Sequence, residues 1–366
     1  MSTASTTIYA EATTVSSATS LKSPVRPSVS VIIPCYNEER FIGKALNNLA
    51  EQYAPEDYEI VIVDGISDDR TREVVDEFRQ SNPNLSVRLL DNPARTIPHA
   101  LNLGIAAARG EIIARMDAHA VPSAGYIRRC VEVLSEGNAA VVGMPCRVRP
   151  GADTATARAI ALAVSHPFGI GDAKYRLGGD GDPRADHGQA QEEVDTVAFA
   201  CFSKSLWSRL GGFDENLLTN EDYDFNYRVR AGGARVVLDC QAYSDYFARP
   251  TLSKLAAQYF RYGAWKARMI RSRPRALKLR QLAAPVFVAS IPLLAAAGFW
   301  RSMAWTMLGL EVVTYVLAAL YFAYRATQKQ QAGAAVMWLL PIAFFTIHFS
   351  WGTSFLLGLV MPRGHK

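Results

Sequence analysis

Two segments near the N-terminus decide the fold, 30-SVIIPCYNEERFIGKALNNL-49 and 59-EIVIVDGISDDRTREVV-75. Each begins with a short apolar run typical of a buried strand, 29–33 and 59–63, and each run is followed by a helical pattern. Pro34 is expected to end the first strand. Further along, strands are predicted at 87–90 and 111–116, with a helix around 99–108 between them. Strands that alternate with helices at this spacing predict parallel βαβ units and an α/β fold with helices on both faces of the sheet.

Polar residues that follow the strands are the first candidates for a binding site, because ligands of such sheets collect at the carboxyl ends of the strands. Asp64 ends the second strand, where its carboxylate can accept a hydrogen bond from a base or ribose. Taken alone, an aspartate there is more often a helix cap or turn residue. The two interpretations stay open at this point.

Asp117 and His119 follow the fourth strand two positions apart. This spacing lets both side chains converge on one cation that also binds a diphosphate, and such a cation would neutralise charge on a leaving nucleotide. Their place at the end of a buried strand, downstream of Asp64, favours metal ligands over a turn. An imidazole beside a carboxylate favours Mn²⁺ over Mg²⁺, which prefers oxygen ligands.

The C-terminal third has a different composition from the rest. From residue 246 onwards it contains a single acidic residue, Glu311, and three long apolar stretches at 282–300, 303–322 and 333–360. Each is long enough to cross a bilayer as a helix, although Pro341 leaves a broken or re-entrant third helix open. Basic residues before the first stretch and between the second and third predict a cytoplasmic catalytic domain and an external C-terminus.

The distribution of charge and of cysteines indicates the cellular environment of the chain. A net charge of +5 does not by itself indicate binding to nucleic acid, but the position of the basic residues suggests contact with a membrane surface. A basic cluster immediately before the first apolar stretch fits contact with anionic lipid, with a solvated basic helix as the alternative. Its members are Arg261, Lys266, Arg268, Arg271, Arg273, Arg275, Lys278 and Arg280. The five scattered cysteines predict reduced thiols rather than disulfides or a zinc site.

These patterns predict four regions. Residues 1–27 are expected to be a disordered tail, since they are rich in Ser, Thr and Ala and lack the pattern of a signal peptide. A catalytic domain is expected over 28–268, a basic juxtamembrane segment over 269–281 and a membrane domain of about three helices over 282–360. The mixed-charge segment 178–188 is interpreted as a loop over the active site.

The order of motifs resembles that of family-two glycosyltransferases with the GT-A fold, a Rossmann-like mixed sheet flanked by helices. The resemblance covers about residues 28–268. It rests on the two segments quoted above and on 100-ALNLGIAAARGEIIARMDAH-119, 210-LGGFDENLLTNEDYDFNYRVRAGG-233 and 258-QYFRY-262. The Asp-Ala-His variant, the stretch 166-HPFGIGDAKYR-176 and the C-terminal spans resemble most closely the succinoglycan-type exopolysaccharide glucosyltransferases.

This resemblance implies a role for each matching residue. Pro34, Tyr36 and Glu38 would line the nucleotide pocket, Asp64 would contact the uracil of a UDP-sugar, and Asp117 and His119 would hold the metal. Asp222 would be the catalytic base that deprotonates the acceptor hydroxyl, and Gln258, Arg261 and Tyr262 would lie near the donor diphosphate and the acceptor. The sequence departs from the family pattern at Gly65, often an aspartate, at His119, and at Tyr262, usually a tryptophan.

The function implied is that of an inverting, metal-dependent enzyme at the plasma membrane. It would move a sugar, glucose in the first instance, from a UDP-sugar to a polyprenyl-linked glycan in exopolysaccharide or cell-surface glycan synthesis. Direct transfer to polyprenyl phosphate is an alternative. A non-catalytic nucleotide-sugar sensor or scaffold is a second one, which Gly65 and His119 favour and which Asp222 opposes.

Overall fold

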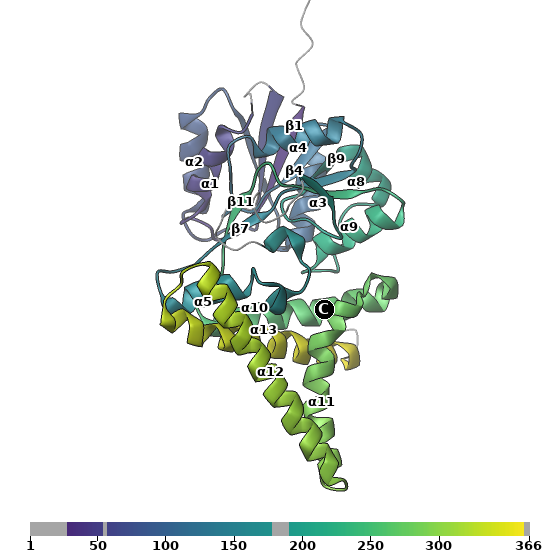
Figure 1. Cartoon of the computed structure of the whole chain (residues 1–366). Coiled ribbons are helices and arrows are strands. Elements are labelled where there is room, and N and C mark those ends of the chain that lie inside the picture. Colours follow the sequence, from purple (N-terminus) through teal and green to yellow (C-terminus); the bar gives the residue numbers. More distant parts are fainter. Residues whose placement is uncertain (1–27, 54–56, 178–189, 362–366) are drawn as a thin grey trace, which may run out of the picture.

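The computed structural model describes residues 28–53, 57–177 and 190–361. The predicted tail at 1–27 and the predicted loop at 178–188 lie outside these ranges. Figure 1 shows an α/β unit above a group of long C-terminal helices.

An eight-stranded mixed sheet forms the centre of the α/β unit. The strand order is β3 (Ser86–Asp91), β2 (Tyr58–Asp64), β1 (Val29–Cys35), β4 (Ile112–Arg115), β9 (Cys201–Ser203), β6 (Val141–Gly143), β10 (Val236–Asp239) and β8 (Gln191–Glu193). Strand β1 pairs in parallel with β2 and β4, whereas β9 runs antiparallel to both β4 and β6. The predicted α/β class is therefore confirmed, and the antiparallel strands make the sheet mixed.

Pro34 does not end the first strand, contrary to the prediction. Strand β1 continues to Cys35, and Pro34 stays in register with Val63 of β2. The carbonyl of Ile32 accepts from the amide of Met116 on the β4 side, so the nitrogen of Pro34, two residues on, faces the same side. The β1–β4 pairing ends at Ile32, and the missing N–H therefore removes no ladder hydrogen bond.

Alternating side chains of the strands bury two faces, as expected for a sheet covered on both sides. On one face, Val31, Ile33 and Ile60 pack with α1 (Ile42–Ala50), α2 (Thr71–Ser81) and α4 (Tyr126–Ser135). On the other, Ile32 and Val61 pack with α3 (Ile97–Ala107), α8 (Lys204–Leu210) and α9 (Glu221–Ala231). This two-sided core fixes the strand ends from which the site is built.

A small second sheet connects the α/β unit to the C-terminal helices. It consists of β5 (Val121–Pro122), β11 (Ser244–Phe247) and β7 (Cys146–Arg149), with β11 in the middle. Figure 1 shows β7 and β11 on the side of the main sheet that faces the long helices. Short helical elements lie at α6 (Pro167–Ile170), η2 (Lys174–Arg176), η3 (Pro274–Ala276) and η4 (Leu279–Leu282).

The long helices share one hydrophobic cluster with the α/β unit. They are α5 (Ala155–Ala163), α10 (Leu252–Ser272), α11 (Ala283–Gly298), α12 (Ser302–Lys329) and α13 (Ala334–Val360). Buried residues of α5, α10, α12 and α13 pack together, among them Ile160, Tyr259, Ala323 and Phe344. The segments Leu279–Gly298, Ser302–Lys329 and Ala334–Val360 are long and apolar enough to cross a membrane by length and composition.

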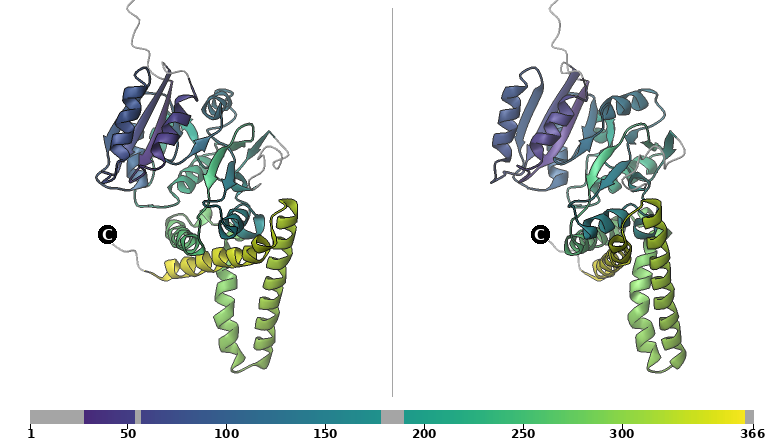
Figure 2. Two further views of the ribbon diagram at one scale, coloured as in Figure 1. Left: turned by 90° about the vertical axis from the view of Figure 1, so that its left-hand side faces the viewer. Right: turned by 60° about the vertical axis from the view of Figure 1, so that its left-hand side comes forward.

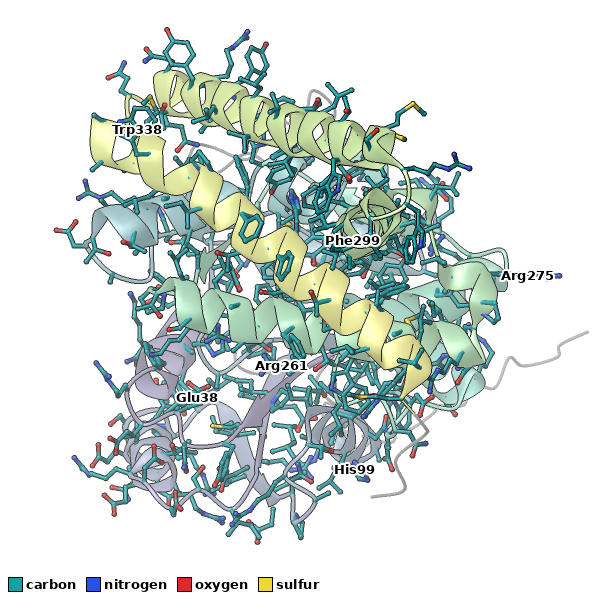
Figure 3. All side chains as sticks on the ribbon, turned by 90° about the horizontal axis from the view of Figure 1, so that it is seen from below. Glu38, His99, Arg261, Arg275, Phe299 and Trp338 are labelled. Atoms are coloured by element: carbon teal, nitrogen blue, oxygen red, sulfur yellow. The ribbon has the colours of Figure 1, made fainter. Side chains whose placement is uncertain are left out.

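The third apolar helix does not run alongside the other two. Helices α11 and α12 form a projecting hairpin, whereas α13 lies across its base and along α10 (Figure 2). Close approach to α10 requires glycine: a Cβ on Gly263 would come within 2.3 Å of the carbonyl oxygen of Trp351. The side chain of Arg271 on α10 donates hydrogen bonds to the carbonyls of Leu359 and Met361 at the end of α13. Seen from below in Figure 3, α13 crosses beneath α10 and carries Trp338 near its start.

Three side chains of the basic cluster have carboxylate partners within the protein, which the sequence did not predict. Arg273 pairs with the fully buried Asp224, and Lys278 and Arg280 both pair with Asp195. A buried carboxylate requires a counterion, and these basic residues supply it.

Candidate active site

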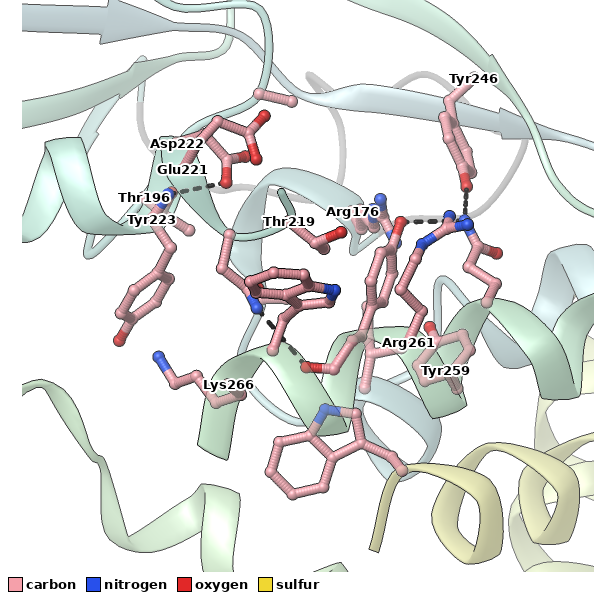
Figure 4. Close-up of a pocket in the computed structure, with 18 of the residues that line it drawn as sticks. Arg176, Thr196, Thr219, Glu221, Asp222, Tyr223, Tyr246, Tyr259, Arg261 and Lys266 are labelled. Atoms are coloured by element: carbon pink, nitrogen blue, oxygen red, sulfur yellow. Dashed lines mark hydrogen bonds between the residues drawn. The ribbon is translucent and has the colours of Figure 1, made fainter. Parts of the chain in front are cut away.

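One cavity of about 1190 Å³ lies between the carboxyl ends of the strands and the long helices. It collects residues from β1, β4, α9 and α10, which are far apart in the sequence. Of the residues predicted for the site, all but Asp64 line this cavity: Pro34, Tyr36, Glu38, Asp117, His119, Asp222, Gln258, Arg261 and Tyr262. Figure 4 shows the part of the cavity around α9 and α10.

Asp64 lies beneath the cavity rather than in its lining. Its carboxylate is fully buried, accepts hydrogen bonds from the amide and hydroxyl of Ser67, and pairs with Arg72 at 3.2 Å. The next residue, Gly65, does line the cavity and allows Tyr36 to lie close, since a Cβ there would be 3.1 Å from the tyrosine ring. In this structure Asp64 therefore shapes the turn that carries Gly65.

The loops after three neighbouring strands hold strained backbone. Asn37 after β1, Ile66 after β2 and Arg95 after β3 all have φ between 55° and 60°. A left-handed conformation is costly for a residue other than glycine, above all for the β-branched Ile66. The first two loops are tied together by the hydrogen bonds between Asn37 and Asp68. Strain retained at strand ends next to a cavity is typical of a binding site.

Arg115 at the end of β4 links the two halves of the site. Its Nη2 lies 2.8 Å from Oδ1 of Asp117 and 4.0 Å from Oε1 of Glu221 on α9. Its Nε is buried and has no hydrogen-bond partner within the described residues. Although Arg115 is part of the Arg-Met-Asp-Ala-His stretch, nothing in the sequence indicated that it would meet α9.

The two predicted metal ligands are held by separate partners. Asp117 pairs with Arg115, and Nδ1 of His119 lies 3.3 Å from Oε1 of Glu38, which raises the pKa of His119 chiefly through this hydrogen bond. Residues 28–53, 57–177 and 190–361 contain no group of three or more His, Cys, Asp or Glu side chains placed to hold a metal ion. The donor set is thus one carboxylate oxygen and one imidazole nitrogen. It fits a cation whose remaining ligands come from a bound diphosphate and water.

Two adjacent carboxylates begin α9. Glu221 is buried, and burial together with the charge of Asp222 raises its pKa well above its usual range. Asp222 lies in the cavity wall and its Oδ1 accepts a hydrogen bond from the amide of Tyr223 at 2.7 Å. Asn220 before them has a left-handed backbone, with φ of 68°. Because a helix N-terminus favours negative charge, both carboxylates are well placed here.

The Gln-x-x-Arg-Tyr motif on α10 orients tyrosines in the cavity. The buried Gln258 donates from Nε2 to the hydroxyls of Tyr262 at 2.9 Å and Tyr246 at 3.1 Å (Figure 4). Arg261 lies beside the ring of Tyr262 at 6.0 Å. Gln258 thus acts on the site by fixing two aromatic side chains.

Two basic cavity residues have surroundings that form only in the fold, and of these Lys266 was missed as a site residue by sequence reasoning. Arg176 lies against the rings of Tyr246 and Tyr175, and Lys266 lies with Nζ 3.3 Å from the centre of the Tyr223 ring. Burial lowers the pKa of Lys266 to about 7. Both are basic side chains placed against aromatic rings inside the cavity (Figure 4).

The cavity continues between the long helices. Its lining includes Ala284 and Phe287 of α11, Tyr315 of α12, and His348 and Trp351 of α13. The wall is held in place by Phe168: its carbonyl lies 2.8 Å from Nε2 of His348, and its ring packs on Phe322 and Phe344. A single space therefore joins the polar strand ends to the apolar helices.

The mixed sheet, with a cavity at the carboxyl ends of its strands, has the GT-A fold. Residues 30–203 match the family model of glycosyl transferase family 2, and residues 193–366 match that of glycosyl transferase family 21. Over residues 30–203 the chain is therefore similar to glycosyl transferase family 2, and this match indicates a glycosyltransferase.

Individual relatives agree with this assignment. The chain is 28% identical over 328 residues to the succinoglycan biosynthesis protein ExoA of Rhizobium meliloti, which covers 89% of this chain and 93% of that protein. It is 27% identical over 250 residues to dolichyl N-acetyl-alpha-D-glucosaminyl phosphate 3-beta-D-2,3-diacetamido-2,3-dideoxy-beta-D-glucuronosyltransferase of Methanococcus voltae, covering 66% of this chain and 74% of that one. Mannosyltransferase PcManGT of Pyrobaculum calidifontis, solved with GDP-Man and Mn²⁺, has a TM-score of 0.58, 22% identity, and coverage of 93% of this chain and 88% of that chain.

Proposed function

We propose that the chain is an inverting glycosyltransferase that moves a sugar from a UDP-sugar to a lipid-linked glycan acceptor. The observation that carries the proposal is the continuous cavity, which joins the strand-end residues to helices apolar enough to lie in a membrane. A soluble donor can enter from the strand side, and a lipid-linked acceptor can enter from the helix side. The similarity to the succinoglycan biosynthesis protein ExoA supports exopolysaccharide or cell-surface glycan synthesis as the process, and glucose is the donor sugar that we propose.

The donor is proposed to bind across the ends of β1, β2 and β4. Tyr36, with Arg95 5.2 Å from its ring centre, offers an aromatic surface for the base. Asp117 and His119 would hold a divalent metal with the diphosphate, and Mn²⁺ is the metal in the solved neighbour of the same fold. Such a metal would stabilise the negative charge that develops on the leaving nucleoside diphosphate.

Asp222 is the proposed catalytic base. It would accept the proton of the acceptor hydroxyl as that oxygen bonds to the anomeric carbon and the bond from this carbon to the diphosphate breaks. Attack opposite the leaving group inverts the anomeric configuration. Glu221 is the poorer candidate because it is buried and lies against Arg115, which also places Asp117.

The acceptor is proposed to be carried on an isoprenoid phosphate or diphosphate. The M. voltae relative is named for a dolichyl phosphate that carries one N-acetylglucosamine, which supports an acceptor of this class. The position of Trp351 and Phe287 in the cavity lining gives the isoprenoid an apolar surface next to the reacting groups.

The catalytic unit is proposed to lie on the cytoplasmic face of the plasma membrane. Helices α11 and α12 would cross the bilayer as a hairpin, and α13 would lie along its surface with an exposed apolar side that includes Trp338, Phe345 and Phe349. Within the hairpin, the hydroxyl of Ser290 donates to Glu311 at 2.5 Å and satisfies one oxygen of an otherwise costly carboxylate.

The test is release of UDP from a panel of UDP-sugars by membranes that contain the protein. Lipid-linked acceptor extract and either Mn²⁺ or Mg²⁺ are supplied, and Asp117→Ala is the control. Metal-dependent turnover of one donor, lost in the variant, would support the proposal and name the sugar. Measurable UDP binding without turnover of any donor in the presence of acceptor would contradict it.

A further inference from the structure

Arg176 has an environment that the proposed chemistry leaves unexplained. Its guanidinium carbon lies 4.7 Å from the ring centre of Tyr246 and 5.4 Å from that of Tyr175, and Tyr259 and Tyr262 complete the surrounding group. We refer to these four tyrosines as the tyrosine cage. The Nε of Arg176 is buried and has no hydrogen-bond partner in the described part of the chain. The residue lines the same cavity as Asp222.

A guanidinium in such a place requires an anion. Arginine remains charged at any physiological pH and presents five N–H donors, whereas aromatic faces attract the charge without accepting all of these hydrogen bonds. Burying a cation without an anionic partner is strongly unfavourable. Elsewhere in this protein, buried charges are paired: Asp224 with Arg228 and Arg273, and Asp239 with Arg129. No described carboxylate is paired with Arg176 in this way.

The tyrosine cage lies on the membrane side of the cavity. Tyr259 and Tyr246 pack in the same hydrophobic cluster as Ala319 of α12 and Phe344 of α13. The proposed donor end has its own basic residues, because Arg95 and Arg115 line the cavity there and Arg115 pairs with Asp117. An anion at Arg176 would thus meet the cavity where it opens towards the long helices.

The cage is also close to the proposed base. Tyr175, which precedes Arg176, lines the same cavity as Asp222. An acceptor bound there would have its phosphate near its reacting hydroxyl.

We infer that Arg176 and the tyrosine cage form a binding site for the phosphate group of an isoprenoid carrier. The inference rests on the proposed function and makes it more specific. The acceptor is a lipid phosphate, or a lipid diphosphate with a short glycan, whose phosphate lies within a sugar or two of the attacked hydroxyl. The planar guanidinium suits a phosphate because two N–H groups can bind two of its oxygens at once.

The experiment measures binding to the purified full chain in detergent. Farnesyl diphosphate is the probe, farnesol is the same lipid without phosphate, and UDP with Mn²⁺ reports the donor end. The variants are Arg176→Gln, Arg176→Lys and, as a matched control, Arg209→Gln, whose guanidinium lies at the surface of α8 and bonds only Ser205 among the described residues.

We expect wild type to bind farnesyl diphosphate more tightly than farnesol. Arg176→Gln should weaken farnesyl diphosphate binding roughly tenfold or more and leave farnesol and UDP binding unchanged, because it removes a charge-assisted contact. The affinity of Arg176→Lys for farnesyl diphosphate should lie between those of wild type and Arg176→Gln. Arg209→Gln should bind farnesyl diphosphate as tightly as wild type. Retained UDP binding shows that each variant is folded.

Two results would overturn the inference. Weaker UDP binding with unchanged farnesyl diphosphate binding in Arg176→Gln would assign the cage to the donor diphosphate. Equal farnesyl diphosphate binding by wild type and Arg176→Gln would show that no phosphate binds there. Failure of the proposed function is read separately, as absence of UDP-sugar binding or turnover in wild type.

Discussion

Arg115 forms an ion pair with Asp117, with 2.8 Å between Nη2 and Oδ1, and the same nitrogen lies 4.0 Å from Glu221. Asp117 follows β4, whereas Glu221 is the first residue of α9 next to Asp222. One arginine thus connects the proposed metal ligand to the helix that carries the proposed base. The same side chain therefore bridges Asp117 and Glu221, the residue that precedes the proposed base.

Replacing Arg115 with Gln should destabilise the protein. The change leaves Glu221 buried beside Asp117 without its cation, and removing one partner of a buried ion pair costs about 3 to 5 kcal/mol. Thermal unfolding of the detergent-solubilised protein is the measurement. In the double variant Arg115→Gln/Glu221→Gln the stranded carboxylate is gone, and we expect part of the stability to return. A double variant whose loss of stability equals the sum of the losses of the two single variants would contradict the coupling.

Lys266 should make stability depend on pH in a defined direction. Burial lowers the pKa of Lys266 in the folded state to about 7, below the usual 10.5. Folding is therefore less favourable at every pH at which the amine of the unfolded chain is charged. The full penalty applies below about pH 7. Between that pH and the unfolded pKa the unfolded state binds more protons, and stability rises with pH.

Lys266→Met should therefore melt above wild type, by roughly 5 °C at pH 6, with a difference that shrinks towards pH 10. Methionine retains most of the buried stem of lysine. Melting curves of both proteins across this range are the measurement. A difference that grows with pH, or a variant less stable than wild type at pH 6, would show that the charged amine has a compensating partner.

The arrangement of α13 predicts the side of the membrane on which its end lies. With α13 at the surface, Val360→Cys and Arg301→Cys at the hairpin tip should be labelled from opposite sides by a membrane-impermeant maleimide. Three crossings would place both on the same side. The native cysteines are all buried and give little background. Labelling of both positions from one side would contradict the surface helix.

Close contact of α13 with α10 depends on Gly263. A Cβ there would meet the Trp351 carbonyl and Ser354, so Gly263→Val should separate the helices and lower the melting temperature by several degrees. Gly309→Val is the matched control, because nothing lies within 4 Å of a Cβ at that helical glycine. Equal melting of the two variants would show that the contact contributes little.

Much of the fold could be predicted from local pattern. The apolar runs in β1 and β2 and the polar residues after each strand predicted a sheet with a site at its carboxyl edge, and nine of the ten predicted site residues line one cavity. Asp64 was predicted from its place at a strand end, but that place cannot show that Ser67 and Arg72 engage its carboxylate.

Other features depend on long-range packing. Arg115 and Arg176 acquire their surroundings from α9, α10 and β11, which lie far along the chain. Hydropathy measures the length and composition of α13 but not its direction, which the structure shows to run along α10, where Gly358 lies against Ala264 and Ala267. Charge counting likewise could not show that Arg273 and Arg280 neutralise buried aspartates.

The most direct test of the central claim compares UDP binding with UDP release in wild type and Asp222→Asn. The substitution preserves size and removes the base, so we expect UDP–Mn²⁺ binding to be unchanged and release from the preferred UDP-sugar with acceptor to fall roughly 10²- to 10⁴-fold. Turnover by Asp222→Asn at the wild-type rate would contradict the assignment of Asp222 as the base and, with it, the proposed mechanism of transfer.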